Sequence, residues 1–233
     1  CSLKVSPHEA ESWEFPESRC LSQTYLWSSG DEGQTWRGPY ATEIEGLCAD
    51  RVLPLRDDLW LLAIQRWSTR FPGAMRVQVA RSVDGGRTWP VASLLAEESG
   101  FQHDEPSVIP LPDGRLVCVM RENTHSTRPS HFAVSEDEGV NWSSPRPSPF
   151  YGDRPAGGVL RSGRLLVTYR NVEPGPGEAK LKVGRNPGTS AWTGDLEGLE
   201  VRGGESRFME LEHDPSGRHG DHGYSAWVQF DDG

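Results

Sequence analysis

Short apolar runs separated by turn-forming residues make up most of this chain. Val, Leu, Ile and Trp are grouped in runs of a few residues, with Gly, Pro, Asp and Ser at their ends, a pattern typical of β-strands joined by turns. Few segments repeat apolar residues at the 3.6-residue period of a helix, and 26 Gly and 18 Pro interrupt the chain. The pattern therefore predicts an all-β protein.

Pairs of these runs predict β-hairpins, because two apolar runs flank a short turn sequence. This arrangement occurs at residues 51–64 around Asp57-Asp58, at 108–120 around Pro-Asp-Gly, at 157–169 around Ser162-Gly163, and at 227–233, where a further hairpin begins.

An eight-residue pattern close to S-x-D-x-G-x-T-W occurs three times. The copies SGDEGQTW, SVDGGRTW and SEDEGVNW end at Trp36, Trp89 and Trp142, at intervals of 53 residues. A fixed period of this length is the mark of a repeat architecture. Each period holds a hairpin, a third strand, this turn and a fourth strand, which is the composition of a propeller blade. Residues 186–192 (NPGTSAW) are interpreted as a degenerate fourth copy.

The residues of the repeat have a local physical explanation. Its Asp accepts hydrogen bonds from backbone N–H groups of the turn, its Gly adopts a backbone conformation that a Cβ resists, and its Trp packs over the turn. The alternative is a calcium loop, for which one acidic position per copy supplies few of the six to eight oxygens needed. We expect the repeats to be structural.

Length and charge narrow the class of protein. The 233 residues suffice for one domain with a buried core. The net charge of −10 and the lack of a Lys/Arg-rich run predict no nucleic-acid partner. No run of about 18 apolar residues occurs, so we expect no membrane span. The chain begins with Cys1 rather than Met, and we expect it to be a fragment.

The four cysteines lack the C-x-x-C spacing of a zinc site. They are consistent with two disulfides or with free thiols, and Cys118, in an apolar run, is predicted to be a buried thiol. The cysteines leave the compartment open, and we favour an extracellular, periplasmic or lysosomal-type compartment over the cytoplasm.

The repeated S-x-D-x-G-x-T-W pattern resembles the Asp box (BNR repeat) of the sialidase, or neuraminidase, superfamily. The resemblance implies that residues 1–233 form a single sialidase-like domain, an incomplete six-bladed β-propeller. The chain would hold about blades two to six, without most of blade one and the end of blade six. Asp boxes lie on the outside of such propellers, so the chemistry is expected elsewhere.

Residues at equal distances from the hairpin tips predict a ring of polar side chains. Eight residues before the tips lie Asp50, Glu105, Arg154 and Tyr224, and eight residues after them lie Arg66, Arg121 and Arg170. The innermost strands of a propeller meet at its axis, so strand ends at one height form a concave face. The alternative is that strand ends simply attract polar residues.

The resemblance implies roles for six of these residues. The segment 105–121 resembles the one that carries the activating Glu and a carboxylate-binding Arg, and 223–233 resembles the one around the nucleophilic Tyr. Tyr224 is then the nucleophile and Glu105 the base that activates it. Arg121, Arg170 and Arg66 bind the substrate carboxylate, and Asp50 lines the pocket.

Some positions depart from the family pattern or offer other interpretations. The position of the third carboxylate-binding arginine aligns loosely with Glu178, and Arg207 is a more distant candidate. The acid/base Asp is expected upstream of residue 1. The remaining polar residues resemble metal ligands but lack a metal-binding spacing, and we expect no metal; they are His103, Asp104, His219, Asp221 and His222.

The leading hypothesis is an exo-α-sialidase-like glycoside hydrolase that releases terminal sialic acid or a related acidic sugar without a cofactor. Its partner would be a sialylated glycan or another acidic sugar. The alternative is a non-catalytic Asp-box propeller that binds glycan or protein, because a shared fold does not fix an activity.

Overall fold

The computed structural model describes residues 23–67, 75–95, 100–124, 129–172, 188–200, 205–213 and 223–230. In these residues the chain forms antiparallel sheets, each built from strands that are consecutive in the sequence, which confirms the all-β prediction. The first sheet has two strands, β1 (Gln23–Ser28) and β2 (Arg37–Glu45). No helix in the described ranges has the length and apolar character needed to cross a membrane.

Three four-stranded sheets follow. The second sheet consists of β3 (Leu47–Pro54), β4 (Trp60–Trp67), β5 (Met75–Ser82) and β6 (Val91–Leu95). The third consists of β7 (His103–Pro110), β8 (Leu116–Glu122), β9 (His131–Ser135) and β10 (Arg146–Pro147). The fourth consists of β11 (Gly152–Val159), β12 (Leu165–Asn171), β13 (Gly188–Gly194) and β14 (Arg207–His213), with the short helix α1 (Leu196–Glu200) before β14.

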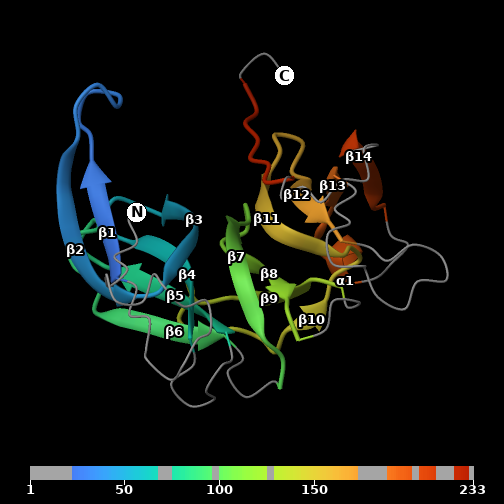
Figure 1. Cartoon of the computed structure of the whole chain (residues 1–233), viewed down its shortest axis with the longest axis horizontal. Helices are drawn as coiled ribbons and strands as arrows, with labels where there is room; N and C mark the ends of the chain where they lie inside the picture. Colours follow the sequence, from blue (N-terminus) through green and yellow to red (C-terminus); the bar gives the residue numbers. More distant parts are fainter. Residues whose placement is uncertain are drawn as a thin grey trace, which may run out of the picture.

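The first strand of each four-stranded sheet lies toward the middle of the molecule. Figure 1 shows β7 between β3 and β11, with the later strands of each sheet farther out. Strand β7 contacts β3, β4 and β5 on one side and β11 on the other. The three predicted hairpins β3–β4, β7–β8 and β11–β12 are confirmed, since each pair is antiparallel around the expected tip.

The eight-residue repeats form the predicted turns. Asp31, Asp84 and Asp137 each accept a hydrogen bond from the backbone N–H four residues later, at 2.9, 2.9 and 2.8 Å. The side chain of that later residue also donates to the carboxylate. These bonds stabilise the ionised form and lower the pKa of Asp31 and of Asp84 to about 2. The hydrogen bonds predicted for the repeat Asp are therefore confirmed at all three copies.

The interpretation of residues 186–192 as a fourth copy is wrong. Residues 188–194 are β13, and Trp192 is fully buried between the third and fourth sheets instead of covering a turn. The helix α1 follows β13 where the other sheets have the repeat. The prediction rested on the 50-residue spacing of Trp192 from Trp142. A tryptophan within a buried strand such as β13 can have this spacing without belonging to the repeated turn.

Apolar side chains fill the spaces between neighbouring sheets. One cluster, which includes Leu61, Val79 and Leu116, packs the second sheet on the third, and another, around Phe132 and Trp192, packs the third on the fourth. Cys118 lies fully buried in the first of these clusters as a free thiol, as predicted. Burial of this area supplies the main favourable free energy that holds the sheets together.

Candidate active site

A one-residue bulge interrupts two of the inner hairpins at the same height. In β7–β8, Ser107 faces Val119, but three residues earlier Asp104 faces Arg121, two residues after Val119. The extra residue lies on β7, where Glu105 has a φ of +46°. A bulge accommodates the missing N–H of Pro106 in the strand and turns the neighbouring side chain.

The β11–β12 hairpin repeats this arrangement. Ala156 faces Thr168, whereas Asp153 faces Arg170, and Arg154 has a φ of +50° just before Pro155. A left-handed backbone at a residue other than glycine costs about 1–3 kcal/mol and is concentrated at functional sites. Counting equal distances from the hairpin tips predicted Glu105 opposite Arg121 and Arg154 opposite Arg170. This pairing is wrong by one residue, because the bulges place Asp104 opposite Arg121 and Asp153 opposite Arg170.

The bulge directs Glu105 toward the fourth sheet. Its Oε2 accepts a hydrogen bond from the backbone N–H of Arg154 at 2.9 Å and lies 3.4 Å from Nη1 of Arg121. Its own backbone N–H donates to Oε1 of Gln65, on β4, at 2.7 Å. The Glu105 carboxylate is therefore fixed by contacts with two strands, β8 and β11, and its backbone by a third, while its side chain keeps a small exposed fraction.

Asp153 joins the two arginines of the site. Its Oδ1 lies 2.9 Å from Nε of Arg121 and its Oδ2 lies 2.6 Å from Nη2 of Arg170. Burial by itself lowers the pKa of Arg121, but the Asp153, Glu105 and Asp104 carboxyls raise it above its ordinary value. The pKa of Arg170 is likewise raised despite burial, through its hydrogen bond and charge interaction with Asp153. Both guanidinium groups are therefore charged at every physiological pH.

Tyr224 completes the cluster from a segment without strand pairing, residues 223–230. Its hydroxyl accepts a hydrogen bond from Nη1 of Arg170 at 2.8 Å, and that guanidinium lies 5.0 Å from the centre of the ring. Arg154 lies 5.8 Å from the same ring. Trp227 anchors the segment by donating from Nε1 to the carbonyl of Ala156 at 3.1 Å. Tyr224 is 51 % exposed, so its ring is open to a ligand.

Of the six residues to which the resemblance gives roles, the structure therefore brings together four: Glu105, Arg121, Arg170 and Tyr224. Asp50 instead links β3 to β7, since its Oδ2 accepts a hydrogen bond from the N–H of Val108 at 2.8 Å. Arg66 donates from Nη1 to Oε1 of Gln78, on β5, at 3.2 Å. It shares a strand face with Leu62 and Ile64, which pack toward the first sheet.

Three polar residues of the cluster were not predicted to belong to the ring. They are Gln65, Asp104 and Asp153. A signal for two of them is present in the sequence. Residues 104–121 and 153–170 both read D-x-P near the start, G-R-L in the middle and R at the end. An alignment of these two segments pairs Asp104 with Asp153 and Arg121 with Arg170.

Other candidate residues lie away from the cluster or cannot be placed. Arg207, on β14, faces Thr193 of β13, at the end of the fourth sheet opposite to Arg170. His103 is buried, with its Nε2 3.0 Å from Nδ1 of His131. Burial, then the charge of His131 and that of Arg76, lower the pKa of His103 to about 3, so its ring is neutral. The remaining candidates lie outside the described residues, and they are Glu178, His219, Asp221 and His222.

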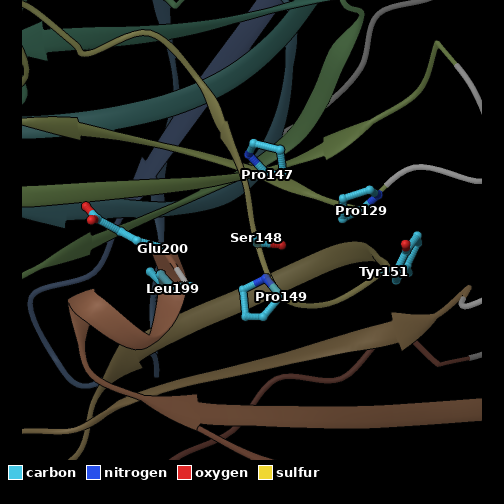
Figure 2. Close-up of a pocket in the computed structure, with 7 residues that line it drawn as sticks. All are labelled: Pro129, Pro147, Ser148, Pro149, Tyr151, Leu199 and Glu200. Atoms are coloured by element: carbon cyan, nitrogen blue, oxygen red, sulfur yellow. The ribbon is translucent and has the colours of Figure 1, made fainter. Parts of the chain in front are cut away.

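Two hollows in the described surface lie outside this cluster. One has a volume of about 270 Å³. Figure 2 shows its lining, with Tyr151 and Pro129 on one side and Leu199 and Glu200 of α1 on the other. Its single carboxylate, Glu200, pairs with Arg146 at 2.8 Å. The other, of about 400 Å³, lies beside Trp227 and the Gly157–Gly158 pair of β11. Tyr151 and Glu200 lie on opposite sides of the first hollow, and Glu200 is paired with Arg146, so the Glu105–Tyr224 cluster is the better candidate site.

Comparison with protein families explains the repeated turns. A model described as "BNR repeat-like domain" matches residues 3–233. The chain belongs to this family. It is thereby a BNR-repeat protein, as the resemblance implied. No curated protein sequence matches the chain significantly.

Solved structures similar to this BNR-repeat chain show the same fold class. A protein of unknown function from Dyadobacter fermentans has a TM-score of 0.66 at 19 % identity over 82 % of this chain. The leech intramolecular trans-sialidase has a TM-score of 0.53 at 16 % identity over 74 % of the chain. The α-L-arabinanase of Penicillium chrysogenum has a TM-score of 0.51 at 13 % identity over 87 %. The chain spans 52 %, 26 % and 57 % of these proteins respectively.

Proposed function

We propose that this BNR-repeat protein is an exo-α-sialidase-like glycoside hydrolase that releases terminal sialic acid or a related acidic sugar. In this proposal the fold is a six-bladed β-propeller, of which the chain supplies about blades two to six. The observation that supports it is the continuous set of contacts from Glu105 through Arg121, Asp153 and Arg170 to the Tyr224 hydroxyl.

In the first step the Tyr224 oxygen attacks the anomeric carbon and the glycosidic bond breaks, which leaves the sugar bonded to Tyr224. Glu105 accepts the phenol proton, directly or through water, in a general-base role. Arg170, hydrogen-bonded to the phenol oxygen, stabilises the negative charge that develops there. The acid that protonates the departing oxygen is not assigned among the described residues.

In the second step water attacks the anomeric carbon and the bond to Tyr224 breaks. The group that protonated the departing oxygen in the first step accepts one proton from the water, and the water's other hydrogen stays on the released sugar as its hydroxyl. The proton held by Glu105 returns to the phenolate. This Tyr-based scheme departs from the two-carboxylate mechanism of most glycosidases. It suits an acidic sugar, because a neutral phenol approaches an anomeric carbon beside a carboxylate with less repulsion than a second carboxylate.

The substrate carboxylate is bound by Arg121 and Arg170 in this proposal. Both are charged, and the planar guanidinium pairs with a carboxylate through two hydrogen bonds. Asp153 holds the two side chains beside each other by contacting one edge of each.

The second candidate is a non-catalytic propeller that binds glycan or protein. Asp153 already pairs with both arginines, at 2.9 and 2.6 Å, which weakens a carboxylate clamp. The family position of the third arginine also aligns with Glu178 in this sequence. A binding module needs neither a charged clamp nor a nucleophile.

Hydrolysis of a fluorogenic sialoside by the full-length protein tests the two candidates. We expect turnover by the wild type, a loss of about 10³-fold or more in kcat for Tyr224→Phe, and a loss of about 10²-fold or more for Glu105→Gln. Tyr40→Phe, at a half-exposed tyrosine on β2 away from the cluster, is the matched control and should keep full activity. Glycan binding without turnover in the wild type would favour the second candidate.

A further inference from the structure

Arg121 lies among three carboxyl groups, and one of them has no role in the reaction proposed above. Its Nε lies 2.9 Å from Oδ1 of Asp153 and 3.8 Å from Oδ1 of Asp104, and its Nη1 lies 3.4 Å from Oε2 of Glu105. Asp153 bridges the arginines, and Glu105 is the proposed base. Asp104 is the remaining carboxyl, and its closest contact with Arg121 is longer than a hydrogen bond.

Asp104 and Asp153 hold equivalent positions but differ in their contacts. Each precedes a bulge and faces an arginine on the next strand. Asp153 forms short ion pairs with two guanidinium groups, whereas the Oδ1 of Asp104 is buried without a hydrogen-bond partner among the described residues. Its Oδ2 accepts a hydrogen bond from Nδ2 of Asn123 at 3.1 Å. Only 5 % of Asp104 is exposed, so water does not compensate its charge.

The groups around Asp104 favour its neutral form. Burial is the main cause that raises its pKa to about 7; Arg121 lowers it, and Glu105 and Asp153 raise it further. The charged or titratable groups on the strands packed around it are His103 and Glu105 on β7, Arg121 and Glu122 on β8, Asp153 on β11, and Arg76 on β5 beyond His103. Among these, His103 is neutral, so Arg121 is the main group that favours ionisation of Asp104.

The charge of Asp104 changes what the two arginines present to a ligand. With Asp104 neutral, the carboxylates of Glu105 and Asp153 balance Arg121 and Arg170, and Arg154 adds positive charge beside Tyr224. With Asp104 ionised, a third negative charge lies 3.8 Å from Nε of Arg121. A carboxylate ligand bound to Arg121 would lie close to this charge and be repelled by it, because charges in a partly buried site are weakly screened.

We propose that Asp104 is a positioning residue that controls whether Arg121 is presented to an acidic ligand. Neutral Asp104 leaves the outer edge of the Arg121 guanidinium for a ligand carboxylate. Ionised Asp104 draws the Nε edge of Arg121 toward itself and adds a negative charge to the site. The control of Arg121 stands on the geometry of the cluster, and the identity of the acidic ligand rests on the proposed function.

Nuclear magnetic resonance of arginine Nε–H groups tests the control of Arg121 without any ligand. In the wild type, the Arg121 Nε resonance, assigned with Arg121→Lys, should shift between about pH 5 and pH 9 with a midpoint near neutrality. Asp104→Asn and Asp104→Leu should both abolish this step. Asp113→Asn removes the same charge at the exposed tip of the same hairpin and should retain it. A wild type without the step, or a step unchanged in both Asp104 variants, overturns the proposal.

Calorimetric binding of N-acetylneuraminate at about pH 5.5 and pH 8.5 separates this inference from the proposed function. The wild type should bind about tenfold more weakly at the higher pH, and Asp104→Asn should change less than about twofold. An intact NMR step with no binding at either pH overturns the acidic-sugar function and supports the control of Arg121. Binding that is equal at both pH values in the wild type overturns the role of Asp104 and supports the sialidase-like site.

Discussion

Arg121 and Asp153 form an ion pair of 2.9 Å between Nε and Oδ1 that joins the third sheet to the fourth. The same aspartate holds Arg170 at 2.6 Å, so one carboxylate fixes the spacing of two guanidinium groups from different hairpins. This spacing is what a carboxylate bound between the arginines would meet. Asp153 is therefore expected to matter for both stability and ligand binding.

Replacement of Asp153 by Asn should destabilise the fold. The substitution keeps the shape but leaves two partly buried guanidinium groups without their shared counter-charge, which we expect to cost about 2–4 kcal/mol in the free energy of unfolding. Urea denaturation measures this loss. Asp113→Asn, at an exposed hairpin tip, is the control and should change the value by less than about 0.5 kcal/mol. Equal stability of the two variants would contradict the bridging role.

The tryptophans of the repeated turns should differ in their contribution to stability. Trp89 is 9 % exposed and packs between the first and second sheets, whereas Trp36 is 63 % exposed. Trp89→Ala should therefore lower the free energy of unfolding by about 3 kcal/mol or more, because a large buried side chain is lost. Trp36→Ala, at the same position of its own repeat, should cost less than about 1 kcal/mol. Similar losses for both would show that the turn itself, and not burial, determines the effect.

Two turn glycines with positive φ offer a matched test of close packing. Gly86 has a φ of +84°, and an added Cβ would lie 2.5 Å from the ring of Trp60. Gly114 has a φ of +91° with nothing within 4 Å. Gly114→Ala should cost about 1 kcal/mol from backbone strain alone, and Gly86→Ala about 2–4 kcal/mol, because the Trp60 ring must also move. Thermal unfolding of the two variants compares these losses.

Stability should depend on pH through Asp104. Its pKa is raised from 3.8 to about 7 in the folded protein, so between these values the folded state binds more protons than the unfolded state. The contribution is therefore complete below about pH 4, falls as the pH rises, and is lost above about pH 7. The difference in unfolding free energy should reach about 3–4 kcal/mol across this window.

Unfolding of the wild type and of Asp104→Asn between about pH 4 and pH 8 measures this contribution. The variant has no carboxyl at this position, so its stability relative to the wild type should increase through the window. Other carboxyl groups titrate in the same range but affect both proteins alike. A constant difference between the two proteins at all pH values would contradict the raised pKa.

The hairpins and the repeated turns could be predicted because their contacts are local in sequence. The Asp84 carboxylate bonds the N–H of Thr88, only four residues later, and the Ser82 hydroxyl accepts the N–H of Gly86. Such contacts depend on residue types within one short segment. The same locality explains the error at residues 186–192, where composition matched the pattern but buried strand pairing of Trp192 decided the structure.

The all-β class, the three inner hairpins, the turns of the repeat and a set of polar residues near the hairpin ends follow from residue types and their order. Which of these side chains meet depends on how the sheets pack. The bulges at Glu105 and Arg154 change the register by one residue, and the pairing of Asp153 with Arg121 joins strands from different sheets. Neither effect can be predicted by counting residues along a regular hairpin. A bulge is stabilised by contacts outside its own hairpin, such as that of the Glu105 N–H with Gln65.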